Sequence, residues 1–280
     1  MVGIRVREYM SSPVIIVSPS DTIARVRNLM LRYGISRLPV VENGVLVGII
    51  TAYDVAKAVD EAGNKPLDTI PVELYMSPNP ITVDADDLLE EAVRLMVKHG
   101  IGGLPVLQDG RLVGIITKSD VVRAYAEKLK GRYRVEDYFD PNVPTVSPSH
   151  SVAYVAKLLF NTPCKRVLVV EGGKLIGIIA PSDLAFATPI QKLSRKVKVY
   201  KVAGFSPRGI YTILPYIHGV ALAADIMTSN PLTVKPNDDL AYAAQLMARY
   251  GFSSVPVVCG ESDVRGIVVK HHILQALIAL

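Results

Sequence analysis

The sequence has few of the features that mark membrane, secreted and metal-binding proteins. Of its 280 residues only Cys164 and Cys259 are cysteines, and they show neither metal-ligand spacing nor a disulfide framework. No apolar run approaches the ~20 residues that a membrane span needs. The N-terminal stretch MVGIRVREYM carries charge where a signal peptide has an apolar core. We therefore expect a cytoplasmic protein with no membrane segment, in which both thiols are buried.

Catalytic and metal-binding motifs are equally scarce. The five histidines are scattered, and the adjacent pair His271-His272 does not place two ligands on one face of a helix. The chain shows no Ser-His-Asp or Cys-His motif and no Walker lysine motif. The sequence therefore predicts no metal site, no catalytic residue and no obligatory cofactor, and it disfavours an enzyme.

What the sequence does contain is one unit written four times, a signature of repeat architecture. The stretch GISRLPVVENGVLVGIITAYD returns as GIGGLPVLQDGRLVGIITKSD with almost the same letters and twice more in diverged form, and each copy has its own lead, such as ELYMSPNPITVDADDLL. The four copies cover Gly34–Asp54, Gly100–Asp120, Pro163–Asp183 and Gly251–His272. Four copies with matching leads indicate a single repeated fold.

Each copy predicts the same order of elements. A short β-type run such as 14–17 precedes a helix with apolar residues at Ile23, Val26 and Met30. A hairpin with turns such as Asn43-Gly44 follows, and a second helix begins at a Thr-x-x-Asp motif. The helix-capping residues are expected at one register: Ser20, Asp86, Ser149 and Asn237. The result is an α/β protein of β-α-β-β-α units, which have too few strands to be stable alone and should pair.

The repeated motifs resemble those of the CBS domain (cystathionine-β-synthase domain). They are Tyr-Met before a proline in the lead, Gly-Ile-x-x-Leu-Pro-Val, Gly-x-Leu-Val-Gly-Ile-Ile and Thr-x-x-Asp. The chain is similar to four-CBS proteins of archaea and, in layout, to the gamma subunit of AMP-activated kinase. The resemblance implies two Bateman modules of two units each, stacked as a disc within one chain or between the chains of a homodimer. The expected units are 1–61, 62–128, 129–188 and 223–280, with a linker at 189–222.

The resemblance also implies a ligand and the residues that hold it. CBS pairs bind AMP, ADP, ATP or S-adenosylmethionine in two clefts. The aspartate of Thr-x-x-Asp holds the ribose hydroxyls, the threonine approaches the phosphates, and the adenine lies among backbone groups. Carried onto this chain, the ligand-binding candidates are Thr51, Asp54, Thr117, Asp120, Asp183, Val14, Ile15, Ile35, Ser36, Arg37, Pro39, Ile101, Gly102, Gly103, Pro105 and Lys118.

The Thr-x-x-Asp motif has a second interpretation. It is close to a capping box, which would explain Thr51/Asp54 and Thr117/Asp120 without any ligand. A helix start with free N–H groups is also a natural phosphate site, so the two interpretations are compatible. The third copy keeps Asp183 but has Ala180, and the fourth has Val269 and His272. The resemblance therefore favours two sites in the N-terminal pair and at most one in the C-terminal pair.

The two clefts of the N-terminal pair should bind with unequal affinity. Arg37 offers a charge to phosphate, whereas the matching position of the second copy is Gly103, preceded by Gly102. Lys118 is a further candidate on the phosphate side, and Arg32, Lys98 and His99 are weaker ones. One charge-assisted hydrogen bond is worth ~1.5–3 kcal/mol, which bounds the difference.

These expectations lead to a regulatory function. We expect a non-catalytic sensor that binds an adenosine compound, chiefly in its N-terminal pair, and transmits this to an unknown effector protein. The alternative is a nucleic-acid-binding or structural protein that uses the basic linker stretch SRKVKVYKVAG. That stretch favours a solvated edge strand, and no RNA-binding or helix-turn-helix motif supports nucleic acid. The mild net charge of +5 does not decide between them.

Overall fold

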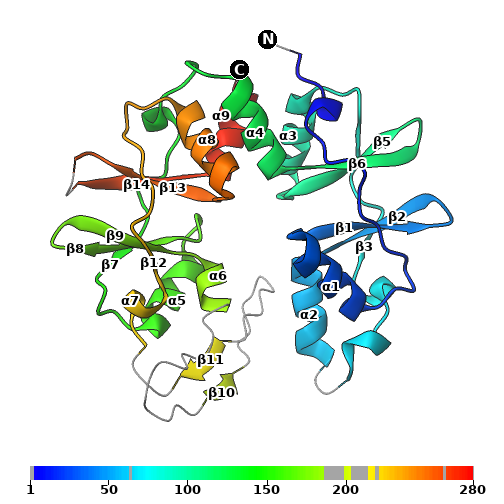
Figure 1. Cartoon of the computed structure of the whole chain (residues 1–280), viewed down its shortest axis with the longest axis horizontal. Coiled ribbons are helices and arrows are strands. Elements are labelled where there is room, and N and C mark those ends of the chain that lie inside the picture. The colour runs from blue at the N-terminus through cyan, green and yellow to red at the C-terminus, as the bar shows by residue number, and fades with distance from the viewer. Residues whose placement is uncertain are drawn as a thin grey trace. The chain divides into compact units, whose positions relative to one another are not determined.

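The fold was analysed in a computed structural model that describes residues 3–62, 65–185, 199–202, 214–217, 221–260 and 263–279. These residues form two compact units (Figure 1). We call residues 1–121 with 277–280 the N-terminal module, and residues 122–276 the C-terminal module. The N-terminal module holds the first and second copies of the repeated stretch, and the C-terminal module holds the third and fourth.

All four copies contain the predicted helix, hairpin and second helix in that order. The first comprises η1 (Val6–Glu8), α1 (Ile23–Tyr33), β1 (Arg37–Glu42), β2 (Val45–Thr51) and α2 (Ala52–Ala62). The second comprises η2 (Leu67–Thr69), η3 (Val72–Leu74), β3 (Ser77–Pro78), β4 (Val83–Asp84), α3 (Leu89–Lys98), β5 (Gly103–Gln108), β6 (Arg111–Thr117) and α4 (Lys118–Lys128). The expected first strand is two residues long in the second and third copies, and in the first and fourth copies it is reduced to a single bridge, Val17 to Val40 and Val234 to Val257.

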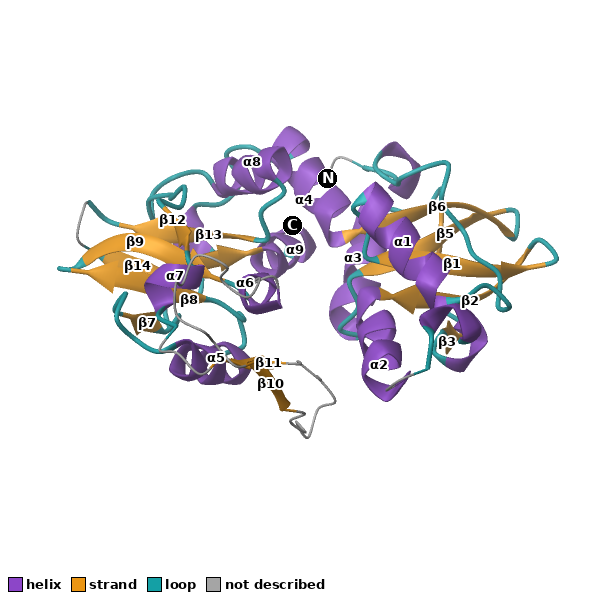
Figure 2. Cartoon of the chain, turned by 60° about the horizontal axis from the view of Figure 1, so that its bottom comes forward, coloured by secondary structure: helices purple, strands orange, loops and turns teal. Residues whose placement is uncertain are grey.

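The third and fourth copies repeat this order. The third comprises η4 (Val135–Asp137), β7 (Thr145–Val146), α5 (Val152–Asn161), β8 (Val167–Glu171), β9 (Lys174–Ile179) and α6 (Pro181–Ala185). The fourth comprises α7 (Ala223–Ile226), β12 (Thr228–Ser229), α8 (Leu240–Tyr250), β13 (Ser254–Val258), β14 (Val264–Val269) and α9 (Lys270–Ile278). Within each module the helices lie beside the strands (Figure 2).

The hairpins form as the turn residues predict. Asn43 and Gly44 both have positive φ, 50° and 81°, as do Asp109 and Gly110. Two successive residues in this conformation make the turn that matches the twist of a two-stranded hairpin. The strands then pair in register, with Arg37 opposite Thr51 in the first copy. This pairing sets the start of α2 beside the start of β1.

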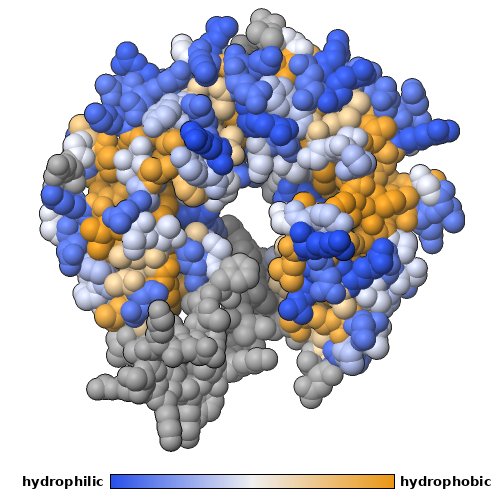
Figure 3. Space-filling view, viewed as in Figure 1, coloured by the Kyte–Doolittle hydropathy of each residue, from blue (hydrophilic) through white to orange (hydrophobic). Residues whose placement is uncertain are grey.

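Packing of the helices against the hairpins forms the core. In the first copy Ile23 and Val26 of α1, with Leu38 and Ile50 of the hairpin, are fully buried in one cluster. In the space-filling view apolar residues gather over the strands β2 and β6 on the face shown (Figure 3). The apolar spacing of the sequence therefore does build the core, at ~25 cal/mol for each Å² of apolar surface removed from water.

The copies within a module exchange their leads. The lead of the second copy, as β3, pairs with β2 of the first, and Ser11 in the first lead bonds to Ile115 of the second copy. In the C-terminal module β12 of the fourth copy pairs with β9 of the third, and Asp140 bonds to Ile267. One hairpin of each module thus gains a short strand from its neighbour and the other gains a single bridge, and these contacts join the two units of a module.

This exchange gives the Tyr-Met of the lead and the glycine of the hairpin a joint role. The sulfur of Met76 would lie 2.7 Å from a Cβ on Gly48, and that of Met10 would lie 2.6 Å from one on Gly114. Met227 covers Gly177 in the same way. In each of these pairs the residues come from different copies, so the methionine and the glycine form a contact between paired units.

Two predictions differ from the structure, the positions of the helix caps and the burial of the thiols. The first helices are capped two residues later than expected, at Thr22, Leu88, Ser151 and Asp239. The predicted cap positions lie in a turn before the helix, in which Asp21 accepts from the Ser18 N–H at 2.8 Å, and this turn delays the helix start. Cys259 is exposed and Cys164 is only half-buried, so the prediction of two buried thiols is wrong. Cys259 lies just past the end of β13, in the connection to β14, where side chains leave the core.

The linker is described only in part. Within the basic stretch, Val199–Val202 forms β10, which pairs with β11 (Leu214–Ile217) in antiparallel register, so a strand is confirmed there. The other residues predicted as linker, up to 220, lie outside the described part of the chain. The unit boundaries given above and the disc remain predictions.

Candidate ligand-binding clefts

The first and last positions of the Thr-x-x-Asp motif form the same contact in every copy, although the residues at these positions differ. The Oδ2 atom of Asp54 accepts from the backbone N–H of Thr51 at 2.8 Å, and Asp120 does so from Thr117 at 2.9 Å. In the third copy Asp183 accepts from Ala180 N–H at 2.7 Å. In the fourth, Nδ1 of His272 accepts from Val269 N–H at 3.2 Å. Half of a capping box is therefore present in all four copies, with histidine replacing the carboxylate once.

The threonines of the first two copies add a second bond to the same carboxylate. The Thr51 hydroxyl donates to Asp54 Oδ2 at 2.6 Å, and the Thr117 hydroxyl donates to Asp120 Oδ2 at 2.7 Å. One carboxylate oxygen is thus used twice by the protein, which holds each aspartate in a fixed position at its helix start. The other oxygen of Asp54 accepts none of these bonds and is the atom suited to a ligand hydroxyl.

A cationic cluster lies beside Asp120 in the N-terminal module. Arg37 Nη1 donates to the carbonyl oxygen of Gly102 at 2.5 Å, so the arginine of the first copy reaches the second. Burial lowers the pKa of Arg37, and the charge of Asp120 opposes that shift. Burial also lowers the pKa of Lys118, and the neighbouring Arg37 lowers it further. The predicted residues Arg37, Lys118 and Asp120 are therefore brought together, in an arrangement that suits an anion.

The remaining predicted residues of the N-terminal module lie along the paired strands and helix starts. Pro39 is buried and its carbonyl accepts from Val17 N–H, while Ile35 and Ile15 pack against the first core cluster. Ser36 is exposed, and its carbonyl accepts from the N–H of Ala52 at 2.8 Å. The other members are half-buried or buried: Val14, Ile101, Gly102, Gly103 and Pro105. Their role toward a ligand stays a prediction.

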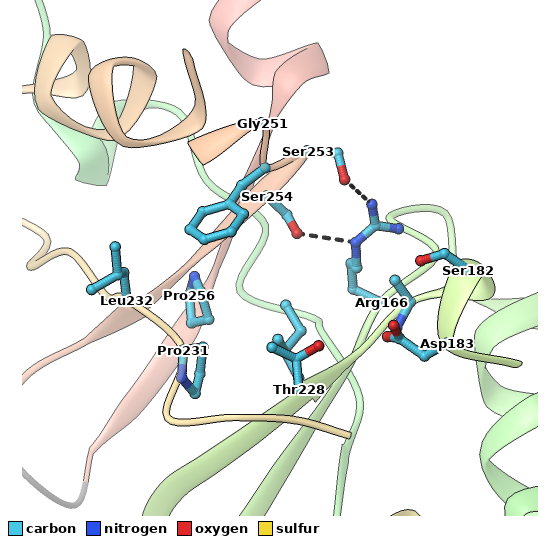
Figure 4. A pocket seen from close by; sticks show the side chains of 13 residues that line it. Arg166, Ser182, Asp183, Thr228, Pro231, Leu232, Gly251, Ser253, Ser254 and Pro256 are labelled. Carbon is cyan, nitrogen blue, oxygen red and sulfur yellow. Dashed lines mark hydrogen bonds between the residues drawn. The ribbon is translucent and has the colours of Figure 1, made fainter. Parts of the chain in front are cut away.

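The C-terminal module contains a pocket of about 230 Å³ (Figure 4). Its volume is just below the ~300–1,000 Å³ typical of pockets that enclose small molecules, so a nucleotide would remain partly exposed there. One part of the lining is polar and the other apolar. The polar part is Arg166, Ser182, Asp183, Thr228, Ser253 and Ser254; the apolar part includes Ile178, Pro231, Leu232, Phe252 and Pro256.

Arg166 is the charged residue of this pocket that was not among the candidates predicted from the sequence. Its Nε donates to the Ser254 hydroxyl at 3.0 Å, its Nη2 donates to the Ser253 hydroxyl, and its Nη1 donates to the carbonyl of Lys165 at 2.6 Å. Arg166 occupies in the third copy the register of Arg37 in the first, which is a signal that alignment of the copies could have used. Its serine partners come from the fourth copy, and only the packing of the two copies reveals them.

The charges of this pocket are partly withdrawn from solvent. Burial lowers the pKa of Arg166, while the nearby Cys164 and Asp183 raise it. Burial raises the pKa of Asp183 above its ordinary value, against the lowering effects of the Ala180 N–H and of Arg166. The residue Asp183, predicted as a candidate site, thus lines a pocket. The fourth copy contributes to the lining of that pocket through residues between 251 and 256.

Comparison with known proteins agrees with this architecture. The model of the CBS domain family matches residues 6–61, 72–127, 135–189 and 223–279, which together make up most of the chain. The chain therefore belongs to the CBS domain family, and four CBS repeats form it.

Known relatives include whole-chain and paired-domain proteins. Protein MJ1225 of Methanocaldococcus jannaschii is 26% identical over 279 residues, covering 94% of each chain. Its crystal structure, described as that of a proposed archaeal homolog of g-AMPK, has a TM-score of 0.69 at 24% identity and covers 98% of this chain and 100% of that one. At that identity the likeness shows a shared fold.

Two solved CBS pairs contain bound ligands. The pair of protein MJ0100, in complex with 5′-methylthioadenosine and S-adenosyl-L-methionine, is 32% identical and covers 44% of this chain and 97% of that one, with a TM-score of 0.40. CBSX2 of Arabidopsis thaliana, in complex with AMP, is 28% identical and covers 45% and 98%, with a TM-score of 0.39. Those two proteins thus bind adenosine compounds. Across the described residues of this chain, no helix is long and apolar enough to cross a membrane.

Proposed function

We propose that this chain is a non-catalytic regulatory protein that senses an adenosine compound in the clefts of its CBS pairs. The candidate ligands are AMP, ADP, ATP and S-adenosylmethionine, and the bound state is transmitted to an effector protein. The observation that carries the proposal is the C-terminal pocket, where a helix-start carboxylate, a held arginine and an aromatic ring line one cavity. The chemistry matches a ribose diol, an anionic group and a base, respectively.

The N-terminal module supports the same function through different residues. Asp54 and Asp120 are each held at a helix start by a threonine and a backbone N–H, and Arg37 and Lys118 supply positive charge near Asp120. We therefore include both N-terminal clefts in the proposal. Binding can shift the arrangement of two paired copies only as far as the ligand prefers one arrangement over the other.

Calorimetric titration of the full chain with AMP, ADP, ATP and S-adenosylmethionine tests the proposal. Asp54→Ala, Asp120→Ala and Asp183→Ala should each weaken binding at one cleft by roughly tenfold to a hundredfold, since a charge-assisted hydrogen bond is worth ~1.5–3 kcal/mol. His272→Ala is the matched control, because it removes the equivalent cap contact from the copy that has no candidate aspartate.

The outcomes separate capping from ligand binding. If all four alanine variants lose thermal stability but keep the wild-type affinity, the aspartates only cap their helices. If none of the four compounds binds the wild type, the sensor proposal fails. Recovery of the bound compound unchanged after long incubation supports a non-catalytic role, whereas its conversion would indicate an enzyme.

A further inference from the structure

The two modules each place an arginine of one copy against the next copy, but the receiving residues differ. Arg37 meets Gly102 and Gly103, whereas Arg166 meets Ser253 and Ser254 at the same register. The glycines leave room for the Arg37 guanidinium, since a Cβ on Gly102 would lie 2.7 Å from Arg37 Nη2. The serines instead bind the guanidinium through their hydroxyls. In the N-terminal module the glycines leave room for the arginine, whereas in the C-terminal module the serines supply two hydrogen-bond acceptors.

The serine contacts fix the direction of the Arg166 side chain. Nε and Nη2 donate to the two hydroxyls and Nη1 donates to the Lys165 carbonyl, so each nitrogen of the guanidinium is held by the protein. A guanidinium still has further N–H groups after these three bonds. Figure 4 shows the group on the same side of the pocket as Ser182 and Asp183. A pre-positioned charge binds an anion without the entropy cost of ordering a long side chain.

The residue just before the serines gives the pocket an aromatic wall. Phe252 stands where the first two copies have Ile35 and Ile101 and the third has Cys164. Its ring stacks on Tyr250, with centroids 5.4 Å apart and planes at 19°, and Arg249 lies 5.5 Å above the Tyr250 ring. Phe252 is 38% exposed and lines the pocket together with Arg166. An aromatic ring held in a stack offers a flat base a surface that an aliphatic residue lacks.

We propose that the segment Phe252-Ser253-Ser254 makes the C-terminal pocket selective for a nucleotide that carries a negatively charged group, over the neutral nucleoside. Phe252 stacks on the base, and the two serines act as positioning residues that hold Arg166 toward the anion. This inference rests on the proposed function for its ligand class. It also assigns the anion preference of the C-terminal module to the fourth copy, whose own helix start lacks the Thr-x-x-Asp pair.

The test compares AMP with adenosine on the full chain. The backbone amide signal of Gly251 in NMR spectra reports binding at this pocket, and the signal of Gly102 reports the N-terminal module. In Ser253→Ala/Ser254→Ala the affinity of the C-terminal pocket for AMP should fall about tenfold, because a charge-assisted interaction loses its fixed geometry, while that for adenosine stays within about threefold. A purely structural role of the serines would weaken both ligands equally and would overturn the inference.

Phe252 is tested by a pair of substitutions. Phe252→Tyr keeps the stack and should keep both affinities, whereas Phe252→Ile introduces the residue type of the first two copies and should weaken AMP and adenosine alike by roughly threefold to tenfold. Equal affinities for wild type and Phe252→Ile would remove the base-stacking role.

Pyrophosphate separates this inference from the proposed function, because it carries charge without base or ribose. It should shift the Gly251 signal in the wild type and shift it at about tenfold higher concentration in Ser253→Ala/Ser254→Ala. If no adenosine compound binds but pyrophosphate behaves in this way, the sensor function fails and the anion position stands. If AMP binds but neither AMP nor pyrophosphate distinguishes the variant from the wild type, the sensor function stands and this inference fails.

Discussion

The N-terminal and C-terminal modules share one scaffold and differ in how they treat the same arginine register. Arg37 lies against Gly102 and Gly103 near Lys118 and Asp120, and burial lowers the pKa of both cations. Arg166 lies against two serine hydroxyls and close to a single aspartate, Asp183. The N-terminal module therefore brings two positive charges together, and the C-terminal module holds one guanidinium by hydrogen bonds to two serines. Repetition preserves the fold while the contacts between copies diverge.

Within the C-terminal module the third and fourth copies also differ at the glycine that receives the neighbouring lead, and this difference predicts the largest effect. A Cβ on Gly266 would lie 2.2 Å from the backbone carbonyl oxygen of Asp140, whereas one on Gly177 meets only the side chain of Met227. Because a backbone carbonyl cannot move aside, Gly266→Ala should lower the free energy of unfolding by ~3 kcal/mol or more, and Gly177→Ala by ~1–2 kcal/mol. Urea unfolding of both variants measures this, and equal losses would contradict the asymmetry.

Substitution of Gly102, which lies against Arg37, should have a smaller effect on stability, and that effect should depend on Arg37. In Gly102→Ser the new Cβ meets only atoms of the Arg37 guanidinium, so the substitution should cost ~1 kcal/mol of unfolding free energy by displacing that group. In an Arg37→Ala background the same substitution should cost almost nothing. A double-mutant cycle measures the coupling, and additive losses would show that the glycine is needed for another reason.

The fourth copy predicts the smallest effect, a dependence of stability on pH. His272 caps its helix as a neutral acceptor, and burial, helped by His271, lowers its pKa from 6.5 while Asp140 opposes the shift. Because the unfolded chain takes up this proton first, the contribution of the cap is complete above about pH 6.5 and is lost as the pH falls through the lower, folded-state pKa. The melting temperature followed from about pH 8 to pH 5 should fall less in His272→Asp, which carries the acceptor of the other three copies. Identical profiles would show that the cap does not titrate.

Much of the fold was predictable because its signals are local. The Asn43-Gly44 turn, the apolar spacing of α1 and the Thr-x-x-Asp at the start of α2 each act over a few residues, and all three form as expected. The capping residues of the first helices were placed two positions early, because a turn closed by Asp21 competes for the same stretch of backbone. The exposure of Cys259 was missed for a similar reason, since a Val-rich run does not show where its strand ends.

Of the candidate site, only the residues that belong to the repeated motif of each copy could be predicted from the sequence. Asp54, Asp120 and Asp183 could be found by comparing the copies, and the structure places all three at helix starts with the same cap contact. The pairing of Arg166 with Ser253 and Ser254 joins residues almost ninety positions apart in the chain. No repeat period predicts such a contact, because it depends on how two copies pack.

The sequence by itself determined that this protein is four CBS repeats, since turn chemistry, apolar periodicity and the helix-start motif are written into each copy. Only the tertiary structure decided which side chains of different copies meet. The packing of the copies decides whether a methionine or a backbone carbonyl lies against the hairpin glycine. It also decides whether the arginine lies against glycines or against serine hydroxyls. The physical reason is that a cleft between copies is shaped by packing and by the hydrogen bonds that buried charges require, and neither is a property of one copy alone.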